Sequence, residues 1–561
     1  WFPAFWPTGE YGPDIENGNN PAIRVTDGPG YVDNSTNYVQ SNIGINFEVP
    51  GVEGLQLMST ISYDKMNYDY KLWNRPWTLY TWDGVNRNSS GLTAAQRGPG
   101  DPSLNQQHTT LTDFTASLNA SYELDLGDHY FKLLGGVTRE ESEQSFFGAF
   151  RRFFLSSDLA QLDLGGNEGQ NSFGNGYETA RLNYYGRLNY TYKDKYLIEG
   201  LFRYDGSYLF PKNNRFGFFP GVSAGWVVSE ESFFQKALPF INFFKLRGSW
   251  GQLGNDNVEP FQYISTYELS QTGLGPVYTT AYESKVANPD ISWETATSRN
   301  AGLDLRTWNN KLTLGLDVYK NSRTDILTTP LKTLPEYSGI AAPAINIGEF
   351  ENSGYEITLG LNGANDSGFS YNLTFNFSDS NNKLVFFDEP DLDDRPWQRE
   401  TGGEIGRPLL YKFDGVFRTQ AEIDSESLDY SGVTPLLKPG DARVVDVSGD
   451  GKIGPEDKTR VGGSAFADTQ FGWNTAINYK NLDFNMYWTG SAGGYNTYEW
   501  SFMSGTLANV QRDVRDRAWS LDNPDAYGPR LADRGDQWYS GQTDAYLITR
   551  DFFRLKTLEF G

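Results

Sequence analysis

The sequence contains no cysteine and only two histidines, so several kinds of chemistry are excluded at the outset. Without a thiol, the 561 residues offer no disulfide, no thiolate metal site and no cysteine nucleophile. His108 and His129 lie a strand's length apart and form no H-E-x-x-H motif, and the chain has no P-loop. Acidic side chains, 71 in all, are too numerous for a catalytic pair to be singled out. We therefore expect no enzyme activity.

Positive charge and long apolar runs are also scarce. Lys and Arg total 47 against 71 Asp and Glu, which gives a formal charge of −24. A nucleic-acid-binding surface needs a basic excess, so we expect no nucleic-acid partner. No stretch approaches the ~18 apolar residues that a membrane-spanning helix requires. These absences are typical of a soluble protein, but also of a transmembrane β-barrel, in which only alternate residues of each strand face lipid.

Apolar and polar residues alternate along paired segments. Between residues 182 and 192, every second position is Leu, Tyr or Gly, and the positions between are mostly Asn, Arg and Thr. Residues 312–318 carry Leu or Val at each even position. The preceding Asn309-Asn310 predicts a two-residue hairpin turn, because asparagine tolerates positive φ. Comparable short turns are expected at 50–53, 126–128, 193–195, 365–367 and 480–481, with a longer one at 230–240.

The connections between hairpins are long and irregular, at 71–108, 147–176, 255–290, 328–350, 384–467 and 495–545. Short turns that alternate with long loops are the topology of bacterial outer-membrane barrels. We predict an all-β transmembrane antiparallel barrel, of which residues 1–561 supply about fifteen strands, each ~10 to 16 residues long. Bacterial barrels have even strand counts, so we expect the chain to be a partial barrel. A soluble propeller should show a repeat of ~40 residues, and none is found.

The alternation also predicts which way side chains face. Apolar residues of each hairpin should point at the outer-membrane lipid, and charged or amide residues should point into the lumen. The lipid-facing set comprises Leu182, Leu188, Leu314, Leu359, Leu373, Phe375 and Phe484. The lumen-facing set comprises Arg187, Arg203, Asp304, Asp317, Glu356, Asn376 and Asn485.

The long loop region 384–467 contains a candidate calcium loop at 446–457, which reads D-V-S-G-D-G-K-I-G-P-E-D. Oxygen ligands recur at alternate positions, and Gly451 occupies the position where such a loop turns sharply. The predicted ligands of a structural Ca²⁺ are Asp446, Ser448, Asp450, the Lys452 carbonyl and Asp457. The alternative is an Asp- and Gly-rich turn on an outside loop.

Aromatic residues crowd two of the predicted loops. A stacking platform for sugar rings or peptide side chains is one interpretation, and packing within loops or at the membrane interface is the other. The candidate substrate-binding residues are Trp73, Trp77, Trp82, Tyr495, Tyr498 and Trp500.

Several short motifs, in this order and spacing, resemble the SusC/RagA family of TonB-dependent transporters of Bacteroidota. The resemblance covers roughly residues 180–561. The motifs are R-Y-D-G-S at 203–207, L-R-G-S-W-G at 246–251, W-E-T at 293–295, N-I-G-E at 346–349, N-S-G-Y-E at 352–356, D-V-S-G-D-G-K-I at 446–453 and F-R-L-K at 553–556.

The resemblance implies a barrel of about 22 strands around a plug, a TonB contact segment and a SusD-like surface lipoprotein as lid. The plug and TonB segment are expected upstream of this chain. The implied function is active import of glycan oligomers or peptides across the outer membrane. Two alternatives remain open: a passive porin-like channel, and a secreted glycan-binding β protein.

Overall fold

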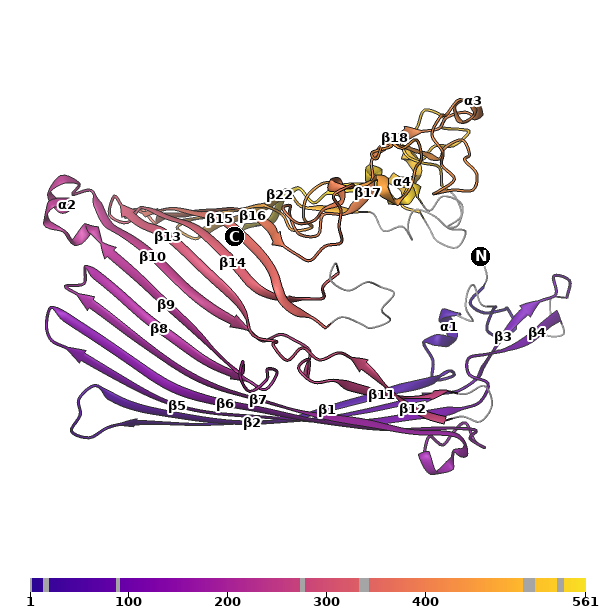
Figure 1. Cartoon of the computed structure of the whole chain (residues 1–561), viewed down its shortest axis with the longest axis horizontal. Coiled ribbons are helices and arrows are strands. Elements are labelled where there is room, and N and C mark those ends of the chain that lie inside the picture. Colours follow the sequence, from indigo (N-terminus) through magenta and orange to yellow (C-terminus); the bar gives the residue numbers. More distant parts are fainter. Residues whose placement is uncertain are drawn as a thin grey trace. The chain divides into compact units, whose positions relative to one another are not determined.

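The computed structural model describes residues 3–13, 20–86, 91–272, 278–331, 343–497, 510–531 and 539–561. Fifteen long strands form one antiparallel sheet, in which successive long strands are neighbours (Figure 1). This confirms the predicted fold class and the predicted strand count. The sheet order is β1 (Gly30–Glu48), β2 (Leu55–Asn74), β5 (Ser103–Asp125), β6 (His129–Arg152), β7 (Gly166–Tyr192), β8 (Tyr196–Ser207), β9 (Phe216–Val227), β10 (Ile241–Asn255), β13 (Glu294–Thr307), β14 (Leu312–Thr328), β15 (Ile345–Ala364), β16 (Phe369–Phe386), β21 (Thr469–Tyr479), β22 (Leu482–Ala492) and β25 (Phe552–Phe560).

Shorter elements lie in the connections. The small strands are β3 (Trp77–Trp82), β4 (Leu92–Arg97), β11 (Thr266–Thr272), β12 (Tyr278–Lys285), β17 (Leu409–Tyr411), β18 (Phe413–Val416), β19 (Ala442–Val444), β20 (Lys458–Arg460), β23 (Tyr495–Thr497) and β24 (Leu547–Thr549). The α-helices are α1 (Pro21–Arg24), α2 (Ser232–Ala237), α3 (Gln420–Asp424) and α4 (Arg512–Arg517). Among the described residues, no helix has the length and apolar character needed to cross a membrane.

The chain divides into two compact units. Unit 1 comprises Trp1–Tyr122 and Leu134–Tyr185, and unit 2 comprises Glu123–Leu133 and Gly186–Gly561. Within unit 2, the long strands from β8 onward lie side by side, with the short turns at one end (Figure 1). Backbone hydrogen bonds join neighbouring turns at that end, such as Trp308 N to Phe240 O at 3.1 Å and Lys480 N to Gly368 O at 3.0 Å.

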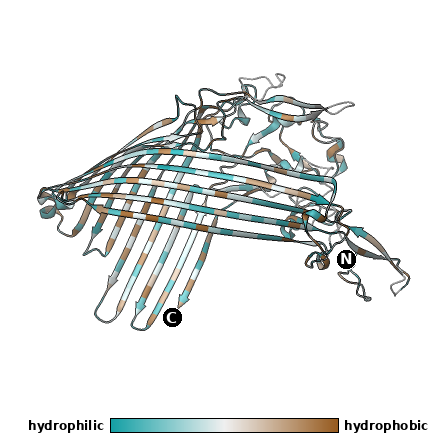
Figure 2. Ribbon diagram, turned by 90° about the horizontal axis from the view of Figure 1, so that it is seen from below, coloured by the Kyte–Doolittle hydropathy of each residue, from teal (hydrophilic) through white to brown (hydrophobic). Residues whose placement is uncertain are grey.

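The strand register separates an apolar face from a polar face. In unit 2, Leu314 pairs with Leu359, which pairs with Phe375 on the next strand. One residue further along, Gly315 pairs with Thr358, which pairs with Asn376. Brown and teal residues accordingly alternate along the long strands (Figure 2). The polar face therefore carries the predicted lumen residues of these strands, and the apolar face carries the predicted lipid residues.

Eight of the fifteen long strands are longer than the predicted ~10 to 16 residues, because they continue past the apolar band. On β13–β15 the apolar face ends where Arg299, Lys320 and Ser353 pair in one row. In unit 1, Tyr63 pairs with Phe114, but two residues further along the same face Lys65 pairs with Thr112. Beyond these rows polar residues enter the apolar face, as at Thr297, Ser322 and Glu351, so the period-2 hydrophobic signal weakens although pairing continues. β7 reaches 27 residues, and the predicted limit of ~16 was wrong.

The seven short connections between strands occur where the sequence predicts them. One differs in kind: Thr307 pairs with Leu312, so the β13–β14 connection has four residues and not two. Trp308 adopts positive φ there, at 53°, together with Asn309 at 57° and Asn310 at 61°. Left-handed asparagines were expected, but a left-handed tryptophan carries no sequence signal.

Candidate functional site

Three charged side chains form a network on the polar face of unit 2. Arg247 of β10 donates from its two terminal nitrogens to the carboxylate oxygens of Asp317 on β14, with both distances at 2.5 Å. Its Nε donates to Asp304 on β13 at 3.2 Å. The guanidinium lies against Gly302, where a Cβ would sit 2.7 Å from Arg247 Cζ. The network thus joins three strands across the lumen side and compensates the arginine charge.

Loop residues cover part of this polar face and border an open pocket of about 910 Å³. One side of it is formed by β15, β16, β21 and β22, with Thr358, Asn376 and Tyr487 among its residues. The other side comes from the loop residues around Phe466, which is 74% exposed, and around Arg550. Hydroxyl and amide groups outnumber charges in the lining. A pocket of this kind accommodates a polar solute better than an apolar one.

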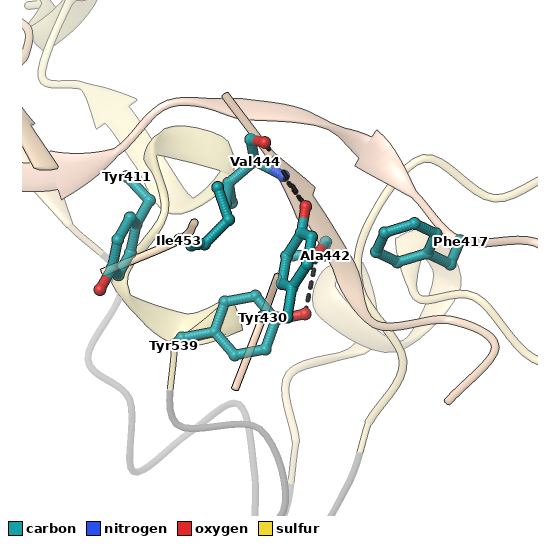
Figure 3. Close-up of a cluster of buried hydrophobic side chains, with 7 residues drawn as sticks. All are labelled: Tyr411, Phe417, Tyr430, Ala442, Val444, Ile453 and Tyr539. Carbon is teal, nitrogen blue, oxygen red and sulfur yellow. Dashed lines mark hydrogen bonds between the residues drawn. The ribbon is translucent and has the colours of Figure 1, made fainter. Parts of the chain in front are cut away.

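The long loops at the end opposite the turns of unit 2 form a folded structure of their own. We call residues 387–468, 510–531 and 539–551 the surface module. Its core consists of buried side chains drawn from β17, β19 and the loops around them (Figure 3). Tyr430 accepts a hydrogen bond from Val444 N at 3.1 Å, and burial raises the pKa of Tyr430 to about 12, so this phenol stays neutral. The core residues are Tyr411, Phe417, Tyr430, Ala442, Val444, Ile453 and Tyr539.

Buried polar contacts join the two loops of the module. Arg530 Nε donates to Asp441 Oδ1 at 2.7 Å, and Asp441 is fully buried. Tyr539 donates through its hydroxyl to the Ala442 carbonyl at 2.7 Å, a bond drawn in Figure 3. The amide of Phe413 donates to an Asp544 oxygen at 2.7 Å. Asp441 is fully buried and the Tyr539–Ala442 bond is buried, so separating the loops would leave buried polar groups unpaired.

The predicted calcium loop lies within the surface module. Its two end residues turn their carboxylates inward onto backbone amides: Asp446 accepts from Gly451 N at 2.9 Å, and Asp457 accepts from Ser448 N at 3.0 Å. Burial alone would raise the pKa of Asp446, but the amides of Gly451 and Gly449 hold it below its usual value. Asp450 is exposed. In the part of the chain that the structure describes, no group of three or more acidic or histidine side chains is arranged to hold a metal.

Comparison of the sequence with known protein families shows which family the chain belongs to. A match to the family described as "TonB dependent receptor-like, beta-barrel" extends over residues 5–497. The chain belongs to the TonB-dependent receptor family. Like other members of that family, it is an outer-membrane β-barrel protein.

Two relatives of this receptor are TonB-dependent receptors from different bacteria. TonB-dependent receptor P3 of Formosa agariphila is 29% identical over 528 residues, which cover 91% of this chain and 50% of P3. TonB-dependent receptor SusC of Bacteroides thetaiotaomicron is 29% identical over 391 residues, 68% of this chain and 37% of SusC. The chain thus spans half or less of these relatives' length. The structure of the RagAB peptide transporter matches with a TM-score of 0.74 at 19% identity, over 94% of this chain and 56% of that one. That likeness shows a shared fold.

The aromatic residues singled out from the sequence have different surroundings in this receptor. Trp73 is 2% exposed and packs edge-on against Phe154, with ring centres 4.7 Å apart, so it serves loop packing and presents no open ring face. Trp77 lies under the guanidinium of Arg24, 5.2 Å from its ring centre. Trp82 is 40% exposed. Tyr495 begins the short strand β23. Tyr498 and Trp500 lie outside the described residues.

One short motif matches a catalytic pattern but lies in a strand. Residues 221–225 read G-V-S-A-G, which fits the nucleophile-elbow pattern G-x-S-x-G. That pattern requires a sharp turn between a strand and a helix. Ser223 instead lies within β9, where it pairs with Glu199 on one side and Ser249 on the other. The serine is therefore part of the barrel wall.

The sequence did not reveal the residues that hold the surface module together. Asp441 and Arg530 are 89 positions apart, in loops that show no periodicity. The nearest sequence signal is the D-V-S-G-D-G-K-I motif, which begins five residues after Asp441. The partner arginine is one of several in a polar stretch, so the pairing depends on the folded module.

Proposed function

We propose that this chain is most of the wall of an active importer, which takes up a polar nutrient across the outer membrane with energy delivered through TonB. Family membership supports the transport class, and we propose glycan oligomers or peptides as the nutrient, the second because the RagAB structure of the same fold is that of a peptide transporter. The observation that carries the proposal is the polar pocket of about 910 Å³ beside the lumen wall. Binding of such a nutrient needs hydroxyl and amide partners, which this lining supplies.

We further propose a SusD-like lipoprotein as the partner that covers the loop end. The surface module supports this assignment, because it is a preformed structure with its own core and not a set of independent loops. A rigid surface binds a partner without the entropic cost of ordering each loop. A passive channel would have no need of such a platform.

The test of this function uses the complete receptor in its own bacterium. Deletion of the TonB contact segment upstream of this chain is expected to abolish growth on the imported nutrient, while the barrel still inserts in the outer membrane. An affinity tag on the complete receptor should recover a surface lipoprotein in stoichiometric amount. If uptake persists without the TonB segment, the porin alternative holds. The outer-membrane location already excludes the secreted glycan-binding alternative.

Calcium binding at residues 446–457 stays a proposal. Asp450 is exposed. To bind an ion, the carboxylates of Asp446 and Asp457 would first have to give up the hydrogen bonds that they accept from backbone amides. We expect Ca²⁺ to slow proteolysis of the surface module with a half-maximal effect near ~10⁻⁴ to 10⁻³ M, the range of extracellular sites. Asp450→Ala should remove this protection, and Asp522→Ala, an exposed acid elsewhere in the module, should not. Equal protection of both variants would contradict the proposal.

Among the aromatic candidates, we propose Trp82 as a nutrient contact. Its ring is partly open and faces Trp6, with the two centres 6.2 Å apart at an interplanar angle of 55°. Two aromatic rings at such a distance present a surface on which a sugar or peptide side chain can pack. Trp77 and Tyr495, both partly covered, are weaker candidates for the same role.

A further inference from the structure

The connection between β9 and β10 differs from the other turns at its end of the sheet. The neighbouring turns in unit 2 are polar and short, as at Lys193–Lys195 and Lys480-Asn481. The β9–β10 connection instead contains helix α2, whose sequence is S-F-F-Q-K-A, followed by Leu238, Pro239 and Phe240. With ~3.6 residues per turn, Phe233, Phe234 and Ala237 share one side of this helix, and Ser232, Gln235 and Lys236 share the other. The helix is therefore amphipathic.

Helix α2 is held against the apolar face of the sheet. Phe234 stacks on Phe244 with ring centres 5.6 Å apart and planes 15° from parallel. Phe244 pairs with Leu305 on β13, and Leu305 pairs with Leu314 on β14, so the stack lies on the face that carries the lipid-facing leucines. The apolar side of α2 thus adjoins the apolar band of the sheet.

The residue before α2 is fixed to the same face. The Glu231 carboxylate accepts a hydrogen bond from the Tyr196 hydroxyl at 2.6 Å and one from the Trp226 indole nitrogen at 3.3 Å. Tyr196 and Trp226 pair across β8 and β9 and stack at 6.4 Å. A tyrosine and a tryptophan at the end of the apolar band are typical of the membrane interface. The helix therefore begins at the depth of the aromatic belt.

Bulky apolar side chains of this connection remain uncovered. Phe233 is 60% exposed, Phe240 is 51% exposed and Leu238 is 36% exposed. They are continuous with the apolar band through the Phe234–Phe244 stack. The polar side of the helix ends in Lys236, the basic residue of its last turn. A lysine beside the apolar band can extend its ammonium group toward lipid phosphates.

We infer that α2 is an interfacial anchor: Phe233, Leu238 and Phe240 insert into the periplasmic leaflet of the outer membrane, and Lys236 lies among its phospholipid headgroups. The short-turn end of such a barrel faces the periplasm, so the partner is the phospholipid leaflet on that side. The anchor fixes the depth of β9 and β10, the second of which carries Arg247 of the lumen network. This role is separate from nutrient import and does not depend on the substrate.

The test places a fluorescent probe at single positions of the complete receptor, reconstituted in phosphatidylethanolamine–phosphatidylglycerol vesicles. The 561 residues contain no cysteine, so a thiol introduced at one position is the one labelling site in this chain. Phe233→Cys and Ser232→Cys, adjacent residues on opposite sides of α2, would each carry an NBD label. Asp366→Cys, exposed in the polar β15–β16 turn, serves as the solvent control. Spin labels on carbon 5 or carbon 12 of the lipid chain report depth.

The label at Phe233 is expected to be quenched at least ~3-fold more strongly than those at Ser232 and Asp366, and more by the carbon-5 than by the carbon-12 spin label. Phe234→Ala, which removes the stack, should reduce this quenching while the barrel remains heat-modifiable in gels. Equal and weak quenching at Phe233 and Ser232 would overturn the inference and indicate that the helix faces water or a periplasmic protein. Equal and strong quenching at the two positions would overturn the orientation assigned to α2.

Discussion

Leu359→Arg is expected to destabilise the folded barrel by about 2–4 kcal/mol, the effect of an arginine on the lipid face near mid-membrane. Leu359 occupies the middle of an apolar row, with Leu314 on one side and Phe375 on the other. The charge would have to stay in hydrocarbon or pull its strand out of register. The measurement is a urea titration of the complete receptor folded into vesicles, followed by the heat-modifiable shift in gel mobility.

Thr358→Arg is the matched control, because Thr358 is the adjacent residue on the polar face. Its cross-strand neighbours include Gly315, which leaves room for a longer side chain. The acidic groups of Glu356 and Asp317 lie on the same face and favour a cation. This variant should unfold at nearly the urea concentration of the parent. If both arginine variants were equally stable, the assignment of the two faces would be wrong.

Asp441→Asn is expected to loosen the surface module by about 3–5 kcal/mol, since it removes the buried carboxylate charge that pairs with the largely buried guanidinium of Arg530. The Arg530 side chain is 16% exposed and that of Asp441 is fully buried. The Lys438 amide, which now donates to Asp441 Oδ2 at 2.8 Å, would keep a weaker acceptor. Hydrogen exchange measured by mass spectrometry should accelerate in β18 and β19, and not in β13–β16.

Asp525→Asn is the control for the module. Asp525 pairs with Arg418 at 2.9 Å, but its side chain is 92% exposed. Exposed ion pairs contribute little to stability, because water solvates both charges when they separate. Exchange in the module should therefore match that of the parent. A similar loosening in both variants would show that overall charge, and not the buried pair, holds the loops together.

The hairpin pattern of the barrel wall could be predicted from the sequence because it depends on local chemistry. Period-2 alternation follows directly from strand geometry and from lipid on one side of the wall. It placed Leu314, Leu359 and Phe375 on one face and Asp317 and Asn376 on the other, as the register shows. The turns were predictable for the same reason, because Asn, Asp, Lys and Gly interrupt the alternation.

The ends of the strands were less predictable, because the alternation of apolar and polar residues does not continue along the whole strand. Past Lys320 and Lys65 the regular apolar face ends, while backbone hydrogen bonds to neighbouring strands continue the sheet. Backbone hydrogen bonds form with almost any side chain, so they cannot be recognised from the amino-acid composition. For that reason the polar extensions of β2 and β7 were expected to be loops.

The sequence by itself determined the class of protein, the number of long strands and the two faces of the wall, because each of these depends on residues a few positions apart. Only the tertiary structure decided that Asp441 meets Arg530, that Trp73 is buried against Phe154, and that α2 lies on the apolar face. These contacts join residues that a short window of sequence does not relate. Their energy comes from burial and from pairing of polar groups away from water, and both arise only when distant segments exclude solvent together.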